Sequence, residues 1–181
     1  MSSFDLAIGV VLEHEGGFVS DVHDPGGATK YGISLRFLKR LGILVDYDHD
    51  GDVDEKDVRA MPRQDAINFY SALFWEPGGF ESIRDQQCAT KYFDVAVNVG
   101  APQANRLALR ACGLPDTVAW MPIDAINFAK PTAWLTAMFR EQSAFYHRIV
   151  AGRPESGRYL PGWLQRAAWP FPALAAVGAA A

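Results

Sequence analysis

The chain has 181 residues, a formal net charge of −4, and 49% hydrophobic and 12% aromatic residues. This size and composition predict one globular domain with a sizeable core, and they exclude a disordered chain. Two cysteines are too few for a disulfide framework. No run reaches about 18 apolar residues, and the N-terminus lacks the basic lead of a signal peptide. We therefore expect a protein made in the cytoplasm without a signal peptide and without stable membrane insertion.

The first segment predicts an amphipathic helix that ends at a glutamate. Its apolar residues recur at the spacing of one helix face, and Glu15 takes the next position on that face. Glu13 lies about 200° round the helix and should face water. Loss of hydration on the inner face and the negative helix end both favour a protonated Glu15, which is the form that a general acid needs. The alternative is an ordinary terminal glutamate that reaches solvent. The apolar residues are Phe4, Ala7, Ile8, Val11 and Leu12.

The next segment predicts a β-hairpin folded back over the end of this helix. Gly16-Gly17 ends the helix, β-forming residues follow, Asp24-Pro25-Gly26-Gly27 is a strong turn pattern, and residues 28–33 are expected to return as a second strand. Such a hairpin would bring Asp24 and Thr29 opposite Glu15.

Two carboxyl groups in this arrangement are what an inverting glycosidase needs. One protonates the leaving oxygen, and the other activates a water on the far face of the sugar, with about 6.5–9.5 Å between them. The sequence offers Asp24 as the base, Asp21 as a rival base, and Thr29 as a hydroxyl that orients the water. The alternative for Asp24 is a purely structural role in an Asp-Pro-Gly turn.

The run EGGFVSDVHDPGGATKYGIS, from Glu15 to Ser34, resembles the motifs of glycoside hydrolase family 108, a group of phage and bacterial N-acetylmuramidases. That family has an E-G-G-[YF] motif followed by D-x-x-D-x-G-G-x-T-x-x-G-I. The resemblance implies a mostly helical, lysozyme-like α+β fold with a small hairpin at the active-site cleft. It also implies Glu15 as general acid, Asp24 as base and Thr29 as helper.

Residues 46–57 form a strongly acidic loop with six Asp and one Glu against one Lys. Acidic residues occupy positions 1, 3, 5, 7 and 12 of the pattern, with glycine at position 6, which is the spacing of an EF-hand calcium loop. Position 12 is an aspartate, one methylene shorter than the usual glutamate. We expect a structural Ca²⁺ in an inserted EF-hand-like loop; the alternative is a solvated acidic turn without metal. The expected ligands are Asp46, Asp48, Asp50, Asp52 and Asp57.

Beyond this loop the pattern is helical. Helices are expected before and after the loop, over residues 34–41 and 55–60, then from Pro62 to Phe74, where Trp75 to Gly79 should stop the chain. Further helices are expected over 82–99, 102–112, 131–151 and 160–169. Residues of about 100–170 would form a C-terminal helical lobe that resembles a peptidoglycan-binding region, within a single domain spanning 1–181.

Three further residues are candidate substrate ligands. Asp94 and Asn98 lie one helical turn apart, where they could bind a sugar or form a polar pair that bridges helices. Tyr31 lies in the segment with Thr29 and is the third candidate for sugar binding.

The residues predict an inverting glycosidase without a catalytic cofactor, and the resemblance implies a lysozyme that cleaves the β-1,4 bond between N-acetylmuramic acid and N-acetylglucosamine. Peptidoglycan would be the partner of a monomeric enzyme, with no nucleic acid. It would act on the periplasmic wall as an endolysin or in wall remodelling, after release by a holin or by secretion machinery. One rival is a lytic transglycosylase that uses Glu15 alone. The other is a calcium-dependent wall-binding or secretion-assisting module without catalysis.

Overall fold

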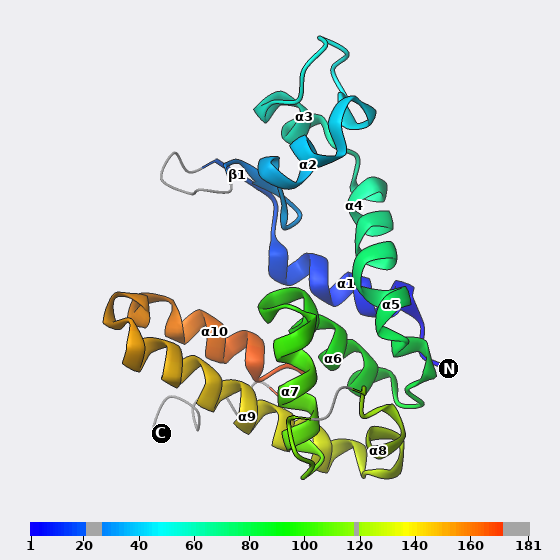
Figure 1. Ribbon diagram of the computed structural model, residues 1–181, viewed down its shortest axis with the longest axis vertical. Coiled ribbons are helices and arrows are strands. Elements are labelled where there is room, and N and C mark those ends of the chain that lie inside the picture. The colour runs from blue at the N-terminus through cyan, green and yellow to red at the C-terminus, as the bar shows by residue number, and fades with distance from the viewer. Residues whose placement is uncertain (21–26, 118–119, 172–181) are drawn as a thin grey trace. The chain divides into compact units, whose positions relative to one another are not determined.

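The computed structural model describes residues 1–20, 27–117 and 120–171 (Figure 1). The chain is mostly helical with one small antiparallel sheet, as expected. It divides into two compact units, residues 8–73 and residues 1–7 with 74–181. Within the described residues, no helix combines the length and apolar character needed to cross a bilayer.

Helix α1 (Phe4–Glu15) confirms the first predicted element and runs from one unit into the other. In residues 8–73 it is followed by three two-residue strands, β1 (Phe18–Val19), β2 (Thr29–Lys30) and β3 (Ile33–Ser34), in the order β1-β2-β3. The expected single return strand over 28–33 is wrong at one point, because a turn at Tyr31-Gly32 divides it into β2 and β3.

Helices complete the 8–73 unit. They are α2 (Leu35–Leu41), the 3-10 helix η1 (Gly42–Val45), α3 (Glu55–Ala60) and α4 (Arg63–Tyr70). The hydroxyl of Ser34 accepts the Phe37 N–H at 3.2 Å and caps α2. A capping box between Asp54 and Asp57 begins α3 within the last residues of the acidic loop. Figure 1 shows that loop as the long connection between η1 and α3.

The helix that begins near Pro62 does not stop at Trp75, contrary to expectation. It continues as a π-helical segment (Ser71–Trp75) and as α5 (Glu76–Gly78). The chain turns only at Gly79, whose φ of 57° suits glycine. Single π-helical turns inserted in α-helices are often found at functional sites.

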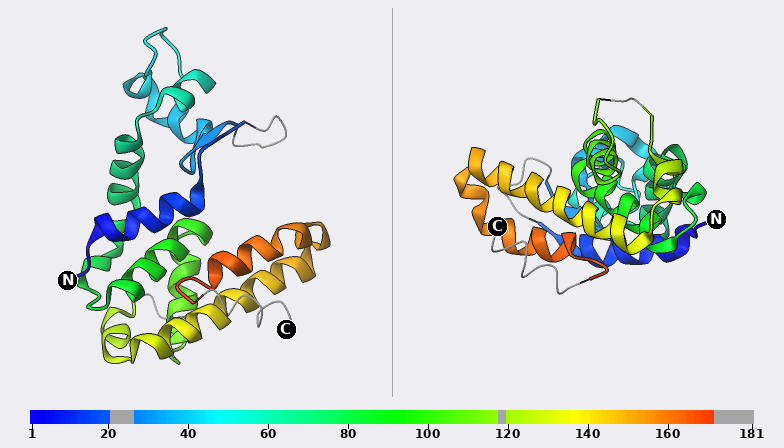
Figure 2. Two further views of the ribbon diagram at one scale, coloured as in Figure 1. Left: turned by 180° about the vertical axis from the view of Figure 1, so that it is seen from behind. Right: turned by 90° about the horizontal axis from the view of Figure 1, so that it is seen from below.

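The other unit is a helical bundle around α6 (Gln86–Val99), in which every residue from Cys88 to Ala96 is buried. The remaining elements are η3 (Phe80–Ser82), α7 (Ala101–Ala111), α8 (Ile123–Phe128), α9 (Pro131–Gly152), η4 (Pro154–Tyr159) and α10 (Leu160–Ala167). Helices α9 and α10 pack side by side after the turn at η4 (Figure 2). The pattern of the sequence missed α8, η1 and η4, which are all short.

Candidate functional site

Glu15 lies at the end of α1, where the helix changes from buried to exposed positions. Ile8, Val11 and Leu12 are buried, Glu13 is exposed and Glu15 is half-buried. The N–H of Gly16 still bonds to the Leu12 carbonyl at 3.2 Å, and Gly16 has a φ of 74°, so the chain leaves the helix immediately after the carboxylate. The predicted difference between the two glutamates is therefore confirmed.

The sheet begins two residues beyond the Gly16 turn. Thr29 pairs with Val19 of β1 on one side and with Ser34 of β3 on the other, so its position is fixed by both neighbouring strands. Asp21 and Asp24, the two candidate bases, lie outside the described residues, in the segment that joins β1 to β2. Thr29 and Asp24 stay predictions as catalytic residues.

The β2–β3 turn meets the end of α1. A Cβ atom placed on Gly32 would lie 2.7 Å from Oε2 of Glu15 and 2.3 Å from Oη of Tyr70. The Tyr70 hydroxyl donates a hydrogen bond to the Tyr31 carbonyl at 2.8 Å. Gly32 is the last glycine of the motif that resembles the family, but the sequence analysis assigned no role to Gly32 or to Tyr70. A Tyr-Gly pair between two short strands could have indicated the turn, but no local pattern points from Tyr70 to Glu15.

The sheet is also bonded to α3, the helix that follows the acidic loop. The ammonium of Lys30 donates to the carbonyls of Arg59 at 2.5 Å and Met61 at 2.9 Å. The Arg59 guanidinium lies 4.0 Å from the ring centroid of Phe18 in β1. Residues of α3 and its C-terminal end therefore contact both strands that flank the Asp24 segment.

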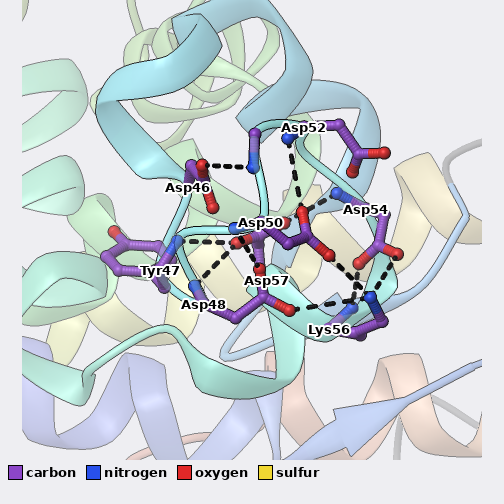
Figure 3. Close-up of polar contacts among 9 residues, drawn as sticks. Asp46, Tyr47, Asp48, Asp50, Asp52, Asp54, Lys56 and Asp57 are labelled. Carbon is purple, nitrogen blue, oxygen red and sulfur yellow. Dashed lines mark hydrogen bonds and ion pairs between the residues drawn. The ribbon is translucent and has the colours of Figure 1, made fainter.

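The acidic loop brings carboxylates together in two overlapping groups (Figure 3). Oxygens of Asp46, Asp48 and Asp50 lie within 4.8 Å of one another, as do those of Asp50, Asp52 and Asp54. Asp54, at position 9 of the loop, was not among the predicted ligands. Positive φ angles at two loop residues, 62° at His49 and 98° at Gly51, allow the tight curvature.

Two observations bear on whether a cation fits this loop. Oδ1 of Asp46 is buried and accepts no hydrogen bond from the part of the chain that the structure describes, as expected of an oxygen that could take a metal ion. The Lys56 ammonium lies 2.7 Å from Asp50, 3.8 Å from Asp48 and 3.7 Å from Asp54. Its hydrogen bond to Asp50 raises the pKa of Lys56 and lowers the pKa of Asp50. The carboxylates thus suit a hard cation, and one internal cation already lies among them.

Asp57, the predicted ligand at position 12, has a different environment from the other aspartates. Its side chain is fully buried. One oxygen accepts the N–H groups of Tyr47 at 2.6 Å and Asp48 at 3.4 Å, and the other accepts the Asp54 N–H at 2.7 Å. The carboxylate closes the loop through backbone bonds, so it could ligate a metal only while it shares its oxygens with these donors.

Asp94 and Asn98 belong to the other unit and already have strong partners there. Asp94 is fully buried and forms an ion pair with Arg166 of α10 at 2.8 Å. Asn98 accepts a hydrogen bond from the Tyr146 hydroxyl of α9 at 2.6 Å. These contacts fit the alternative that the pair bridges helices, and sugar binding by either residue stays a prediction.

The arrangement defines a mostly helical protein with a small sheet beside a half-buried helix-terminal glutamate. Residues 8–100, just over half of the chain, match the family model of glycosyl hydrolase 108. The chain belongs to glycosyl hydrolase family 108, and its fold is lysozyme-like. Membership makes it a glycoside hydrolase by family and implies lysozyme-like degradation of peptidoglycan.

SagA of Brucella abortus has a similar structure, with a TM-score of 0.69 over 98% of this chain and 94% of that chain, at 20% identity. At this identity the similarity shows the fold alone. No curated protein matches the chain.

Proposed function

We propose that this protein is an inverting N-acetylmuramidase that cleaves the β-1,4 bond between N-acetylmuramic acid and N-acetylglucosamine in peptidoglycan. The observation that carries the proposal is the half-buried carboxylate of Glu15 against the β2–β3 turn, in a chain of glycosyl hydrolase family 108. The backbone of Gly32 approaches this carboxyl group closely on one side, and a carboxyl group held in place can serve as a general acid.

The proposed reaction uses two carboxyl groups and one water. Glu15 gives its proton to the glycosidic oxygen as the C1–O bond breaks. A water attacks C1 from the opposite face and loses its proton to Asp24, with Thr29 orienting the water. Asp21 stays the rival for the base. Tyr31, in the turn at Glu15, is the best placed of the proposed sugar-binding residues, because Asp94 and Asn98 would first have to release their helical partners.

We also propose that the acidic loop binds Ca²⁺ as a structural ion. Carboxylates of Asp46, Asp48 and Asp50 and the backbone carbonyl of Asp52 would hold it in the usual order of an EF-hand loop, with Asp54 as a further ligand. The ion would neutralise carboxylates that otherwise repel one another, and it would take no part in bond cleavage. Asp57 would keep its backbone bonds and join the ligands through shared oxygens.

The cellular setting that we propose is that of an endolysin or a wall-remodelling enzyme. It would be made in the cytoplasm and reach the periplasmic wall through a holin or secretion machinery, acting as a monomer with one lysozyme-like domain. From Arg140 onward the sequence has five Arg against two Glu. This basic bias supports a wall-binding role for the helical lobe of about residues 100–170, since the wall polymer is anionic.

The test is loss of turbidity of Gram-negative cells stripped of their outer membrane. Wild type is compared with Glu15→Gln and with Glu13→Gln, a matched control two residues away on the exposed face. We expect Glu15→Gln to lose several orders of magnitude in rate with little change in Tm, and Glu13→Gln to keep the wild-type rate. Near-normal lysis by Glu15→Gln would refute the assignment, and no lysis by wild type with or without calcium would favour the binding module.

Product analysis separates the two cleavage chemistries. Hydrolysis adds one water, whereas a transglycosylase releases a 1,6-anhydro sugar that is lighter by one water in mass spectrometry. If hydrolysis inverts, NMR will show the α-anomer first; initial release of the β-anomer would contradict inversion.

A further inference from the structure

The turn that meets Glu15 has an unusual backbone. Lys30 and Ile33 pair across it, so only Tyr31 and Gly32 form the loop, and both have positive φ angles, 53° and 75°. Two-residue hairpin loops of this kind require a left-handed conformation at both central residues. Glycine adopts it freely, but tyrosine does so only where its surroundings hold it.

Tyr70 of α4 stabilises this conformation of Tyr31. Its side chain is 3% exposed, and its hydroxyl donates to the Tyr31 carbonyl at 2.8 Å. This bond joins residues that lie 39 positions apart in the chain. It is therefore a tertiary restraint on the turn, and it acts on the residue whose conformation needs support.

The absence of a side chain at Gly32 has a specific reason. An added Cβ would lie 2.3 Å from the Tyr70 hydroxyl and 2.7 Å from Oε2 of Glu15, both closer than real Cβ contacts. The bare α-carbon therefore lets the hydroxyl, the turn and the carboxylate approach the same point. Gly113 at the end of α7 differs in this respect: it has a φ of 71°, and no heavy atom lies within 4 Å of such a Cβ.

We propose that Tyr70 and Gly32 are positioning residues for the general acid. Tyr70 fixes the Tyr31-Gly32 turn. The turn then lies against one side of the Glu15 carboxyl group and confines it to one orientation. A general acid must point its proton at the leaving oxygen, and a misplacement of about 1 Å can slow catalysis 100-fold. This inference rests on the proposed role of Glu15.

The first test is Tyr70→Phe, which keeps the buried ring and removes only the hydroxyl. Soluble, uncrosslinked glycan strands of peptidoglycan serve as substrate, so that kcat and KM are measured separately. We expect kcat to fall about 10-fold with KM unchanged, because the variant alters the orientation of the acid. Tyr92→Phe is the matched control: it also removes a hydrogen-bonding hydroxyl from a buried tyrosine, one that donates to Asn105 at 2.8 Å in the other unit, and it should keep kcat.

Gly32→Ala is the second variant, with Gly113→Ala as its control for strain at a positive φ without a contact. We expect kcat to fall about 100-fold for Gly32→Ala and to stay within about 2-fold for Gly113→Ala. Equal losses at both glycines would overturn the contact as the cause. A loss at Tyr70→Phe that appears in KM instead of kcat would overturn the positioning role.

One readout does not depend on activity. The protein is labelled with ¹³C at glutamate carboxyl carbons, and the Glu15 resonance is assigned through Glu15→Gln. Tyr70→Phe should shift this resonance, and Tyr92→Phe should not. If wild type fails to cleave glycan, the proposed function fails but the resonance still decides the contact. Suppose instead that wild type cleaves glycan and Glu15→Gln does not, so that the proposed function holds. If Tyr70→Phe then leaves both kcat and the Glu15 resonance unchanged, the positioning role of Tyr70 is overturned.

Discussion

The two units use charge in opposite ways. In the acidic loop of residues 46–57, most carboxylates are at least partly exposed, and Lys56 is the ammonium among them. In the other unit, Lys91 and Asp94 are fully buried on α6, and Arg166 of α10 pairs with Asp94 at 2.8 Å. The Lys91 ammonium donates to the Ala167 carbonyl at 2.5 Å. The loop brings like charges together at the surface, whereas the bundle buries charged side chains that each have an ion-pair or hydrogen-bond partner.

The difference follows from desolvation. An exposed carboxylate keeps its water, so the loop can hold several of them and exchange one cation for another. A buried charge has lost its water and is stable only while its partner remains in place. The buried cluster should therefore be sensitive to mutation and the loop sensitive to ions.

The largest effect should follow from breaking the buried pair. Arg166→Met removes the 2.8 Å ion pair from the fully buried Asp94 of α6, which should lower the free energy of unfolding by about 3–5 kcal/mol. Arg110→Met is the matched control, because Arg110 pairs with Asp116 at a partly exposed position. Its loss should stay below about 1 kcal/mol. Urea unfolding of both variants gives the comparison.

A loss below about 1 kcal/mol for Arg166→Met would contradict the bridging role of Asp94. Asp94 would then return as a sugar ligand, and KM for glycan strands would be the quantity to follow. A large loss of stability with an unchanged KM would instead assign the α6 pair to structure.

Elements with a strong local pattern could be predicted from the sequence. The apolar stripe of α1 and the opposite exposure of Glu13 and Glu15 follow from helical spacing alone. The start of α3 follows from its capping residues, and the acidic loop from its spacing. The continuation of α4 into a π-helical segment could not be predicted, because the Glu-Pro-Gly-Gly run that follows is a strong local stop pattern.

The partners of the site residues could not be predicted because they come from distant parts of the chain. Tyr70 reaches Tyr31 across 39 positions, and Arg166 reaches Asp94 across 72. The aspartate pattern suggested Asp57 as a simple ligand, but its distance from solvent and its three backbone bonds arise only in the folded loop. Local spacing shows which groups can act, and packing decides what they contact.

A smaller effect is expected from titration of the buried lysine. Burial lowers the pKa of Lys91 from 10.5 to about 8, so between these values the unfolded chain binds a proton that the folded chain does not. The contribution of Lys91 to the free energy of unfolding should therefore rise with pH from about 8 to 10.5, by on the order of 2 kcal/mol. Below pH 8 both states are protonated and the contribution is flat.

The measurement is the free energy of unfolding in urea across this pH range, taken as the difference between wild type and Lys91→Met. Subtraction is needed because burial raises the pKa of Cys88 and Tyr92, which lowers stability at alkaline pH. The exposed Lys130→Met should keep the wild-type pH dependence. A difference between wild type and Lys91→Met that is constant with pH would mean that Lys91 does not titrate in this window.

The smallest effect, and the sharpest test of the loop, concerns its internal cation. The Lys56 ammonium bonds to Asp50 at 2.7 Å and lies near two further carboxylates that are proposed metal ligands. Lys56→Met should therefore raise the affinity for Ca²⁺ about 2- to 5-fold, since the metal no longer displaces a bound charge. Lys39→Met, an exposed change of the same net charge on α2, should leave the affinity unchanged. The measurement is isothermal titration with Ca²⁺, and equal gains in affinity in both variants would indicate a general charge effect. Absence of heat and of any thermal shift in all three proteins would refute calcium binding by the loop.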